Sequence, residues 1–268
     1  MRTAAVTGAR GYVGSRVAAA LRATEWRVRE LTRSDASLEN GAAPGTFDGA
    51  DLAVHCAWSF AARGRGEVTR VNVAGSTRLL DQAADAGVAQ QIWISSLSAF
   101  PGCRSLYGQA KLAVEEHAHS LGGVVLRPGL VWGPGAGGMV GALDRAVSRL
   151  PVIPALAGEV YLAHADDVGA LVAHLGDAEP PTSPVVAAAP TPMSMAAILR
   201  ALAAAAGRTP RVVPVPWPLV WVTLRGLELV GLRPRFRSDS VIGLVAADPD
   251  PFAHGVAPDP VPFRPFAP

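Results

Sequence analysis

Short apolar runs alternate with helical spacing through the first half of the chain. The runs predict strands over residues 4–6, 27–32, 51–57, 91–94 and 124–126. The spacing between them predicts helices that begin near residue 13 and over residues 71–86 and 105–120, with Gly87 ending the second. Nearly continuous apolar strands separated by helices are typical of parallel sheets that helices cover on both faces. The pattern therefore predicts an α/β fold with a doubly wound parallel sheet.

The pattern changes after Arg127-Pro128-Gly129, where glycine and proline become frequent and the expected elements shorter. Helices are expected over residues 139–150, 166–175, 195–206 and 217–230, and a strand over residues 211–215. Ser194 is a suitable N-cap for the third of these helices. Residues 34–50, rich in Gly, Ala, Asp and Pro, are expected to form an irregular connection in which a vestigial strand can occur. We expect residues 1–130 to form the sheet domain and residues 131–268 mainly a smaller lobe, with some elements returning to the sheet.

Three regularly spaced glycines, Gly8, Gly11 and Gly14, follow the first strand directly. In a strand–turn–helix unit such glycines permit the tight turn, let the backbone approach a pyrophosphate and let the helix pack on the strand. The phosphates would lie at the helix N-terminus, where free N–H groups and the positive end of the dipole favour anions. An ordinary glycine-rich turn is the alternative. The strand before it and the helix after it favour a dinucleotide site in a Rossmann-type sheet.

Composition narrows the class of protein. Half of the 268 residues are hydrophobic and 17% are charged, which is typical of a folded body with a sizeable core. The chain has 24 lysines and arginines against 22 aspartates and glutamates, so no charge excess points to nucleic acid or a membrane as partner. The most apolar late segment, residues 217–232, is interrupted by Arg225 and Glu228. It is also shorter than the ~20 residues of a membrane span.

The two cysteines, Cys56 and Cys103, fit a reducing compartment better than a disulfide scaffold. No cationic stretch followed by an apolar segment opens the chain, so we expect a cytoplasmic protein. We expect no metal, because no cluster of Cys and His has metal-ligand spacing.

Tyr107 and Lys111 lie four residues apart on one expected helix and therefore share a face. Tyrosine is a poor acid/base at neutral pH, with an ordinary pKa of about 10, and a neighbouring ammonium favours the phenolate and lowers that pKa. Ser96, which ends the preceding strand, could then hydrogen-bond a substrate oxygen. An exposed helix pair and a capping serine are the alternative. The dinucleotide turn and the fact that Lys111 is the only lysine favour the catalytic interpretation.

With these residues the chain resembles the short-chain dehydrogenase/reductase superfamily. Within it, the chain is similar to the extended or atypical branch, which is the NAD-dependent epimerase/dehydratase family. The resemblance covers nearly the whole chain. It rests on Thr7–Gly14, Val71-Asn72-Val73 with Gly75, Ile94-Ser95-Ser96, Tyr107–Lys111, Arg127-Pro128-Gly129 and His164–Val168.

The resemblance implies roles for individual residues. Tyr107 would be the acid/base, Lys111 its partner and a ribose ligand, and Ser96 the ligand of the substrate oxygen. It also implies three residues beside the cofactor, namely Ala57, Pro128 and Val131. Members of the family often pair through two helices, one of which bears the tyrosine, so a homodimer is consistent with the resemblance.

The end of the second strand bears on the choice of cofactor. Proteins that use NAD usually place a carboxylate there, on the ribose 2′-hydroxyl. This chain has Thr32 followed by Arg33, and a guanidinium suits a 2′-phosphate. Arg10 in the glycine turn could assist, so NADP(H) is favoured and NAD(H) remains an alternative. The full set expected to bind the cofactor is Gly8, Arg10, Gly11, Tyr12, Val13, Gly14, Arg33, Ala57, Lys111, Pro128 and Val131.

The chain departs from the family pattern in two places. Residues 34–50 are shorter than the family's usual segment, and Asp48 is the nearest candidate for its adenine-contacting Asp. Dehydratases of the family carry an Asp-Glu pair after the catalytic Ser or Thr, where this chain has Leu97-Ser98. Because elimination needs that additional acid and base, the sequence argues against a dehydratase.

These observations predict an oxidoreductase that transfers a hydride between a nicotinamide cofactor and a carbonyl or alcohol, in the first place a ketoreductase. An epimerase that oxidises its substrate transiently is the alternative, and a non-catalytic dinucleotide-binding sensor or assembly protein is a further one. The substrate is expected to be a modest, apolar small molecule. The expected pocket residues are Trp58, Leu97, Trp132, Met139 and His164.

Overall fold

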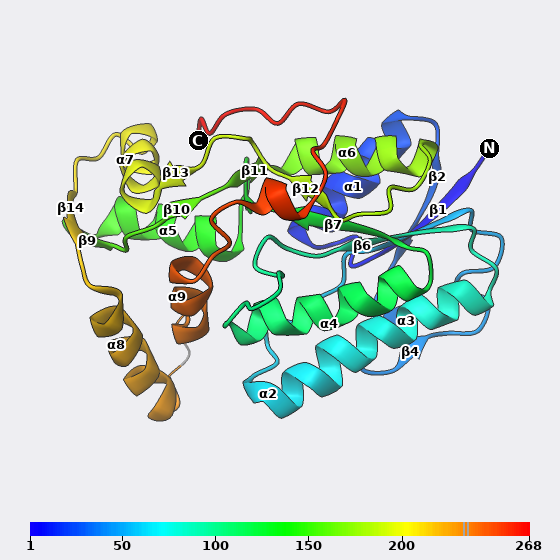
Figure 1. Cartoon of the computed structure of the whole chain (residues 1–268), viewed down its shortest axis with the longest axis horizontal. Coiled ribbons are helices and arrows are strands. Elements are labelled where there is room, and N and C mark those ends of the chain that lie inside the picture. Colours follow the sequence, from blue (N-terminus) through cyan, green and yellow to red (C-terminus); the bar gives the residue numbers. More distant parts are fainter. Residues whose placement is uncertain (233, 235) are drawn as a thin grey trace.

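A six-stranded parallel sheet forms the centre of the protein (Figure 1). The structure, a computed structural model, describes residues 1–232, 234 and 236–268. The strand order is β12-β7-β6-β5-β1-β2, and every neighbouring pair is parallel. The strands are β1 (Thr3–Thr7), β2 (Arg27–Leu31), β5 (Leu52–His55), β6 (Gln90–Ile94), β7 (Val124–Pro128) and β12 (Val185–Ala187). This confirms the predicted doubly wound α/β sheet.

Helices cover both faces of the sheet because successive strand residues point to opposite sides. One face, which includes Ala4 and Val6, packs against α1 (Tyr12–Ala23) and α6 (Ala165–Asp177). The other face, which includes Ala5, packs against α3 (Ala74–Asp85), and α4 (Leu106–Ser120) lies beside α3 on the same side. The predicted helix over residues 71–86 begins earlier in the structure. It follows α2 (Gly64–Glu67) and the π-helical turn η1 (Val68–Val73) without a break.

Residues 34–50 contain two very short strands, in line with the irregular connection and vestigial strand that the sequence predicted. Strands β3 (Ala36–Ser37) and β4 (Gly41–Ala42) form a small antiparallel hairpin that packs on α3. The side chain of Gln82 fixes the hairpin by accepting from the N–H and donating to the carbonyl of Ala42. A short connection can therefore replace a longer one, because α3 supplies the polar partners that the hairpin lacks.

The second half builds a smaller lobe from short paired strands and helices. The strands pair two by two, β8 with β11, β9 with β14 and β10 with β13. They are β8 (Leu130–Trp132), β9 (Val152–Ala155), β10 (Glu159–Val160), β11 (Leu162–His164), β13 (Met193–Ser194) and β14 (Arg211–Pro214). The helices are α5 (Gly138–Arg149), α7 (Met195–Ala205), α8 (Trp217–Leu229), α9 (Ser238–Val245) and the 3₁₀ turn η2 (Pro251–His254).

Parts of the second half also belong to the central sheet. Strand β12 forms its edge beside β7, and α6 packs against α1. The tail contributes as well, since Phe263 is buried in the same hydrophobic cluster as Val6. The backbone N–H and side chain of Arg264 donate hydrogen bonds to the carboxylate of Asp167 on α6.

Candidate active site

The glycine turn between β1 and α1 packs directly against the end of β5. Gly8 has φ +65°, in the left-handed region, and a Cβ there would lie 2.8 Å from the backbone nitrogen of Ala57. A Cβ on Gly14 would lie 2.3 Å from the carbonyl oxygen of Gly8. Only glycine fits at these two positions, which explains part of the sequence motif. The turn aims the start of α1 at the carboxyl edge of the sheet.

The N-terminus of α1 suits the phosphates of a dinucleotide. Among the described residues no side chain caps this helix, and its first turn carries no acidic residue. Gly11 at the N-cap is exposed, so the first N–H groups of the helix are accessible from solvent. The site therefore fits the cofactor that the sequence motif predicts.

Two exposed arginines flank this turn. Arg10 lies within it, and Arg33 follows the end of β2. Asp35 is turned back onto the chain, where its carboxylate accepts bonds of 2.8 and 2.6 Å from the N–H and hydroxyl of Thr32. These hydrogen bonds, with a smaller contribution from the charge of Arg10, lower the pKa of Asp35. Asp48 is exposed and lines a cavity of about 210 Å³ between residues 42–48 and α3.

Ser96 and Tyr107 meet beyond the carboxyl end of β6. The two side chains lie near each other, and both are half-buried. Burial raises the pKa of Tyr107 to about 12, and the nearby side chain of Ser96 opposes that rise. At neutral pH the phenol therefore holds its proton and can donate it.

Lys111 is buried below this pair, with only 4% of its surface exposed. Its Nζ donates a 2.8 Å hydrogen bond to the carbonyl oxygen of Ile94. It also lies 4.1 Å from the ring centroid of Trp58 and 4.3 Å from that of Trp93. Burial lowers the pKa of Lys111 to about 7, against smaller opposing effects of Cys56 and Glu115.

The sequence predicted that Lys111 lowers the pKa of Tyr107, and the structure contradicts this prediction. The ammonium lies 6.0 Å from the centre of the Tyr107 ring and is held by a carbonyl oxygen and two indoles instead. Burial also reduces its charge near neutral pH, because a buried amine disfavours the protonated form. Desolvation of the phenol therefore dominates.

Aromatic rings surround Tyr107. Trp58 meets it edge to face with ring centroids 5.6 Å apart, and Phe60 stacks on it at 6.2 Å. Phe60 is 72% exposed, so it forms an open apolar margin of the site. Trp58 was among the predicted pocket residues, whereas Phe60 and Trp93 were not. Phe60 follows Trp58 by only two residues, and this spacing could have identified it as a further pocket residue.

The N-terminus of α4, which carries Tyr107, is capped from two sides. Ser105 accepts a hydrogen bond from the N–H of Gly108 at 3.0 Å. The carboxylate of Asp239, on α9, accepts bonds from the N–H groups of Leu106 and Tyr107 at 2.7 and 3.1 Å. A carboxylate at a helix N-terminus satisfies free donors and complements the dipole. Asp239 therefore fixes the start of α4 from the second half of the chain.

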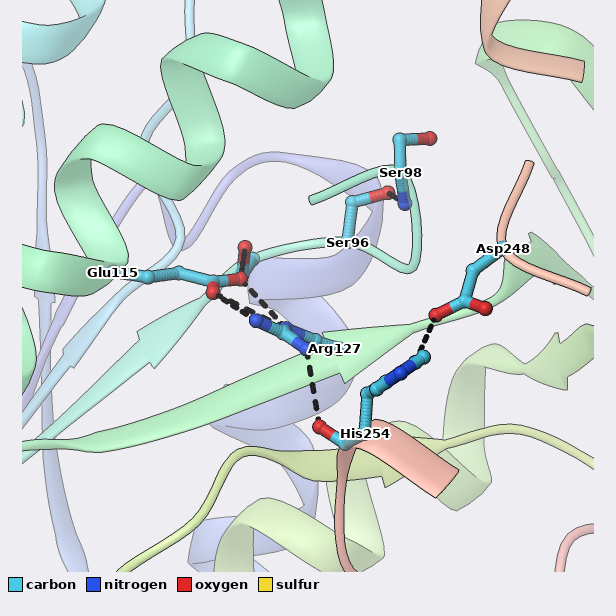
Figure 2. A network of polar contacts seen from close by, with 7 residues as sticks. Ser96, Ser98, Glu115, Arg127, Asp248 and His254 are labelled. Carbon is cyan, nitrogen blue, oxygen red and sulfur yellow. Dashed lines mark hydrogen bonds and ion pairs between the residues drawn. The ribbon is translucent and has the colours of Figure 1, made fainter. Parts of the chain in front are cut away.

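A buried ion pair lies on α4 one turn after Lys111 (Figure 2). Arg127 of β7 donates to both carboxylate oxygens of Glu115, with Nη2 at 2.6 Å from Oε2. Ser95 donates to Glu115, and Arg127 also donates to the carbonyl oxygen of His254 at 3.4 Å. The His254 ring pairs in turn with Asp248 at 2.8 Å. The sequence analysis missed Glu115, although it follows Lys111 by four residues and so shares its helix face.

The other predicted site residues are distributed as follows. Trp132 and His164 contact each other, with ring centroids 4.6 Å apart, and both are buried. His164 caps α6, since its Nδ1 accepts from the N–H of Asp166 at 3.2 Å. Pro128 is buried at the end of β7, while several remaining residues are half-buried: Tyr12, Val13, Ala57, Leu97, Val131 and Met139. The structure thus brings Trp58, Ser96, Tyr107 and Lys111 together and pairs Trp132 with His164 elsewhere.

Comparison with known proteins gives one family. Residues 4–175 match the NAD dependent epimerase/dehydratase family. A ceramide reductase from Caulobacter vibrioides is 32% identical in an alignment of 186 residues that covers 62% of this chain and 58% of that protein. The match therefore spans less than two thirds of the relative's length.

Solved structures share the fold at low sequence identity. The dTDP-4-dehydrorhamnose reductase of Bacillus anthracis, in complex with NADP, aligns with a TM-score of 0.70 and 16% identity over 91% of this chain and 98% of that one. The UDP-glucose 4-epimerase of Thermus thermophilus, in complex with NAD, aligns with a TM-score of 0.62 and 19% identity. That alignment covers 90% of this chain and 97% of the epimerase chain.

Proposed function

The chain belongs to the NAD dependent epimerase/dehydratase family of enzymes, and we propose that it is a nicotinamide-dependent ketoreductase. One observation carries this proposal, the proximity of the half-buried Ser96 and Tyr107 to each other and to a buried Lys111. Reduction of a ketone needs a proton donor at the carbonyl oxygen. A phenol with a raised pKa is protonated at neutral pH and can meet that need.

The roles follow from the positions of the side chains. Tyr107 donates its hydroxyl proton to the developing alkoxide, and Ser96 donates a hydrogen bond that orients the same oxygen. Lys111, tied to the carbonyl of Ile94, holds a cofactor ribose hydroxyl beside the tyrosine. The nicotinamide cofactor supplies the hydride when it is bound.

We further propose a preference for NADP(H). Arg33 and Arg10 are exposed on the two sides of the site where the adenosine ribose of a dinucleotide would lie. A guanidinium binds a phosphate through charge-assisted, bidentate hydrogen bonds. The nearby Asp35 carboxylate already accepts two bonds from Thr32, which leaves it less free to bind a ribose hydroxyl.

The substrate proposed here is an apolar ketone of the size of a lipid precursor. Trp58 and the exposed Phe60 give the margin around Tyr107 an aromatic surface that suits hydrocarbon better than a sugar nucleotide. The ceramide reductase of Caulobacter vibrioides is a relative whose name agrees with this class.

Calorimetry with NADPH and NADH tests the cofactor proposal on the wild type, Arg33→Ala and the control Arg149→Ala. Arg149 is an exposed arginine at the end of α5. We expect NADPH to bind more tightly than NADH, and Arg33→Ala to lower NADPH affinity by about tenfold or more, since hydrogen bonds to charged groups contribute about 1.5–3 kcal/mol. Equal loss in Arg149→Ala, or tight NADH binding that Arg33→Ala leaves unchanged, would contradict the preference.

Turnover of long-chain ketones with the bound cofactor tests the reaction. Tyr107→Phe keeps the ring packing and removes the proton donor, so we expect it to bind cofactor normally and to lose at least about 100-fold in rate. Interconversion of sugar epimers without net cofactor turnover would instead indicate an epimerase. Cofactor binding without any turnover would indicate a non-catalytic dinucleotide-binding protein, and failure to bind either cofactor would contradict the enzyme interpretation itself.

A further inference from the structure

Helix α8 carries several exposed apolar side chains on its outer face. Its 13 residues are all described, and none is buried. Leu219, Val222 and Leu229 are 62%, 60% and 73% exposed. They recur at spacings of three and seven residues, so they form one stripe along the helix. Gly226 lies between them on the same stripe and adds no polar group.

The opposite face of α8 is the one that contacts the protein. Glu228 accepts hydrogen bonds from the N–H and hydroxyl of Ser238 at the start of α9, at 2.9 and 2.7 Å. By helix geometry Leu219 and Val222 lie more than 100° around the helix from Glu228. Figure 1 shows α8 at the outer end of the lobe, attached to the rest through α9 and the chain before it. The apolar stripe therefore points away from the body of the protein.

Positive charge is concentrated in the sequence of α8 and of the residues that follow it. Residues 217–237 contain four arginines, Arg225, Arg233, Arg235 and Arg237, and a single acidic residue, Glu228. Arg225 is half exposed on α8 and pairs with Glu228. The nearly balanced charge of the whole chain thus conceals a local cationic segment.

We propose that α8 is a docking helix for a lipid surface with anionic headgroups. A helix with an exposed apolar stripe and flanking arginines lies in the plane of such a surface, with its stripe among the acyl chains and its arginines at the phosphates. At 1.5 Å per residue α8 is about 20 Å long, which gives a lateral contact. No helix among the described residues has the length and hydropathy to cross a bilayer, and lateral docking requires none.

A second copy of the chain fits this face less well. A symmetric pair through α8 would place the same cationic sequence on both sides of the interface. Neither copy offers an excess of negative charge to the arginines of the other, whereas an anionic bilayer does. The charge pattern therefore favours the lipid surface. The expectation from overall charge that no membrane is involved stays a prediction, and the experiment below tests it against this proposal.

The docking face is connected to the candidate active site. Glu228 of α8 holds Ser238, and the next residue, Asp239, holds the backbone N–H of Tyr107. A surface that binds α8 would bring Tyr107 close to the source of an apolar substrate. The docking itself does not depend on the proposed reaction, because it can be measured without cofactor or substrate.

Vesicle flotation tests the inference. The 268-residue chain is mixed with vesicles of phosphatidylcholine and phosphatidylglycerol at about 7:3, an anionic fraction of the order that attracts polybasic segments. Vesicles of phosphatidylcholine alone serve as the neutral comparison. Each mixture is measured at low and at high salt. The variants are Val222→Glu and Leu229→Glu, with Leu121→Glu as control. Leu121 is an exposed leucine at the far end of α4, and the same charge is introduced there.

We expect the wild type and Leu121→Glu to float with anionic vesicles at low salt. Val222→Glu and Leu229→Glu should each bind about tenfold or more weakly, because each loses an apolar anchor and adds repulsion. Sedimentation equilibrium on the same proteins accompanies the assay. Absence of vesicle binding, binding that both α8 variants leave unchanged, or a wild-type dimer that these variants dissociate would each overturn the proposal.

Discussion

Asp239 accepts a hydrogen bond from the backbone N–H of Tyr107 across 132 positions of the chain. The aspartate lies in the first turn of α9, and the tyrosine lies in the first turn of α4. The contact joins the smaller lobe to the helix that carries the proposed proton donor. The lobe therefore helps to fix the position of the phenol.

Removal of this cap should lower turnover more than it lowers stability. We expect Asp239→Ala to cost about 1 kcal/mol in the free energy of unfolding, the usual value for a cap, and to lower kcat with little change in KM. Ser194→Ala is the matched control, because Ser194 caps α7 through the N–H of Ala197 and touches no proposed catalytic residue. Steady-state kinetics and urea unfolding measure both effects. A fall in kcat of similar size in the control would remove Asp239 from the positioning of Tyr107.

The two indoles beside Lys111 should support its positive charge. Replacement of Trp58 by Leu removes a ring 4.1 Å from Nζ, so the pKa of the ammonium should fall further below its value of about 7. A cation–π contact contributes about 0.5–2 kcal/mol, which corresponds to about 0.4–1.5 pKa units. The pH profile of kcat/KM reports this change. Trp58→Phe keeps a ring and should shift the profile least, and equal profiles for the two variants would argue against the contact.

The pH dependence of stability should also report Lys111. Its pKa is lowered in the folded protein to about 7 from an unfolded value near 10.5, so the unfolded chain binds more protons between these values. Stability should therefore rise with pH across this window, and the penalty is complete below about pH 7. Lys111→Met lacks this proton-binding site. Thermal unfolding of both proteins from pH 7 to 10 should show the wild type gaining stability relative to the variant.

The ion pair between Glu115 and Arg127 should be costly to break on one side only. Both side chains are less than a tenth exposed, so Glu115→Leu would leave a buried guanidinium without its partner. We expect that variant to lose about 3–5 kcal/mol in the free energy of unfolding. The double variant Glu115→Leu/Arg127→Met should recover part of this loss, because no uncompensated charge remains. Denaturant titration of the two variants decides the point, and additive losses would contradict it.

The central sheet could be predicted because its signals are local. Apolar runs such as Val124–Leu126 and the glycines at positions 8, 11 and 14 each specify an element within a few residues. The smaller lobe gave weaker signals, since several of its strands are two to four residues long and gain stability only by pairing. Helix α9 was missed for a related reason. It is eight residues long, and only Ser238 and Val241 are buried.

The residues of the candidate site also fall into two groups, those that a local sequence pattern indicates and those that depend on tertiary contacts. Ser96, Tyr107 and Lys111 could be predicted because a four-residue helix spacing and the end of a strand place them on one side of the sheet. Trp93 was taken as an ordinary strand residue, although its ring flanks Nζ of Lys111. The contact of Asp239 with Tyr107 depends on how the lobe folds back onto α4. No pattern along the chain encodes such a contact, because it joins a side chain of one segment to backbone atoms of a distant one.

The tail has a consequence for biosynthesis. Phe263 completes the hydrophobic cluster around Val6, and Arg264 binds Asp167 of α6. The first strand is synthesised long before Phe263 and Arg264. One side of the core of the sheet therefore lacks Phe263 until the end of this chain is made. Folding of the nucleotide-binding half would then finish only after the tail has emerged. Until that moment the apolar surface that Phe263 covers is open to solvent on the nascent chain.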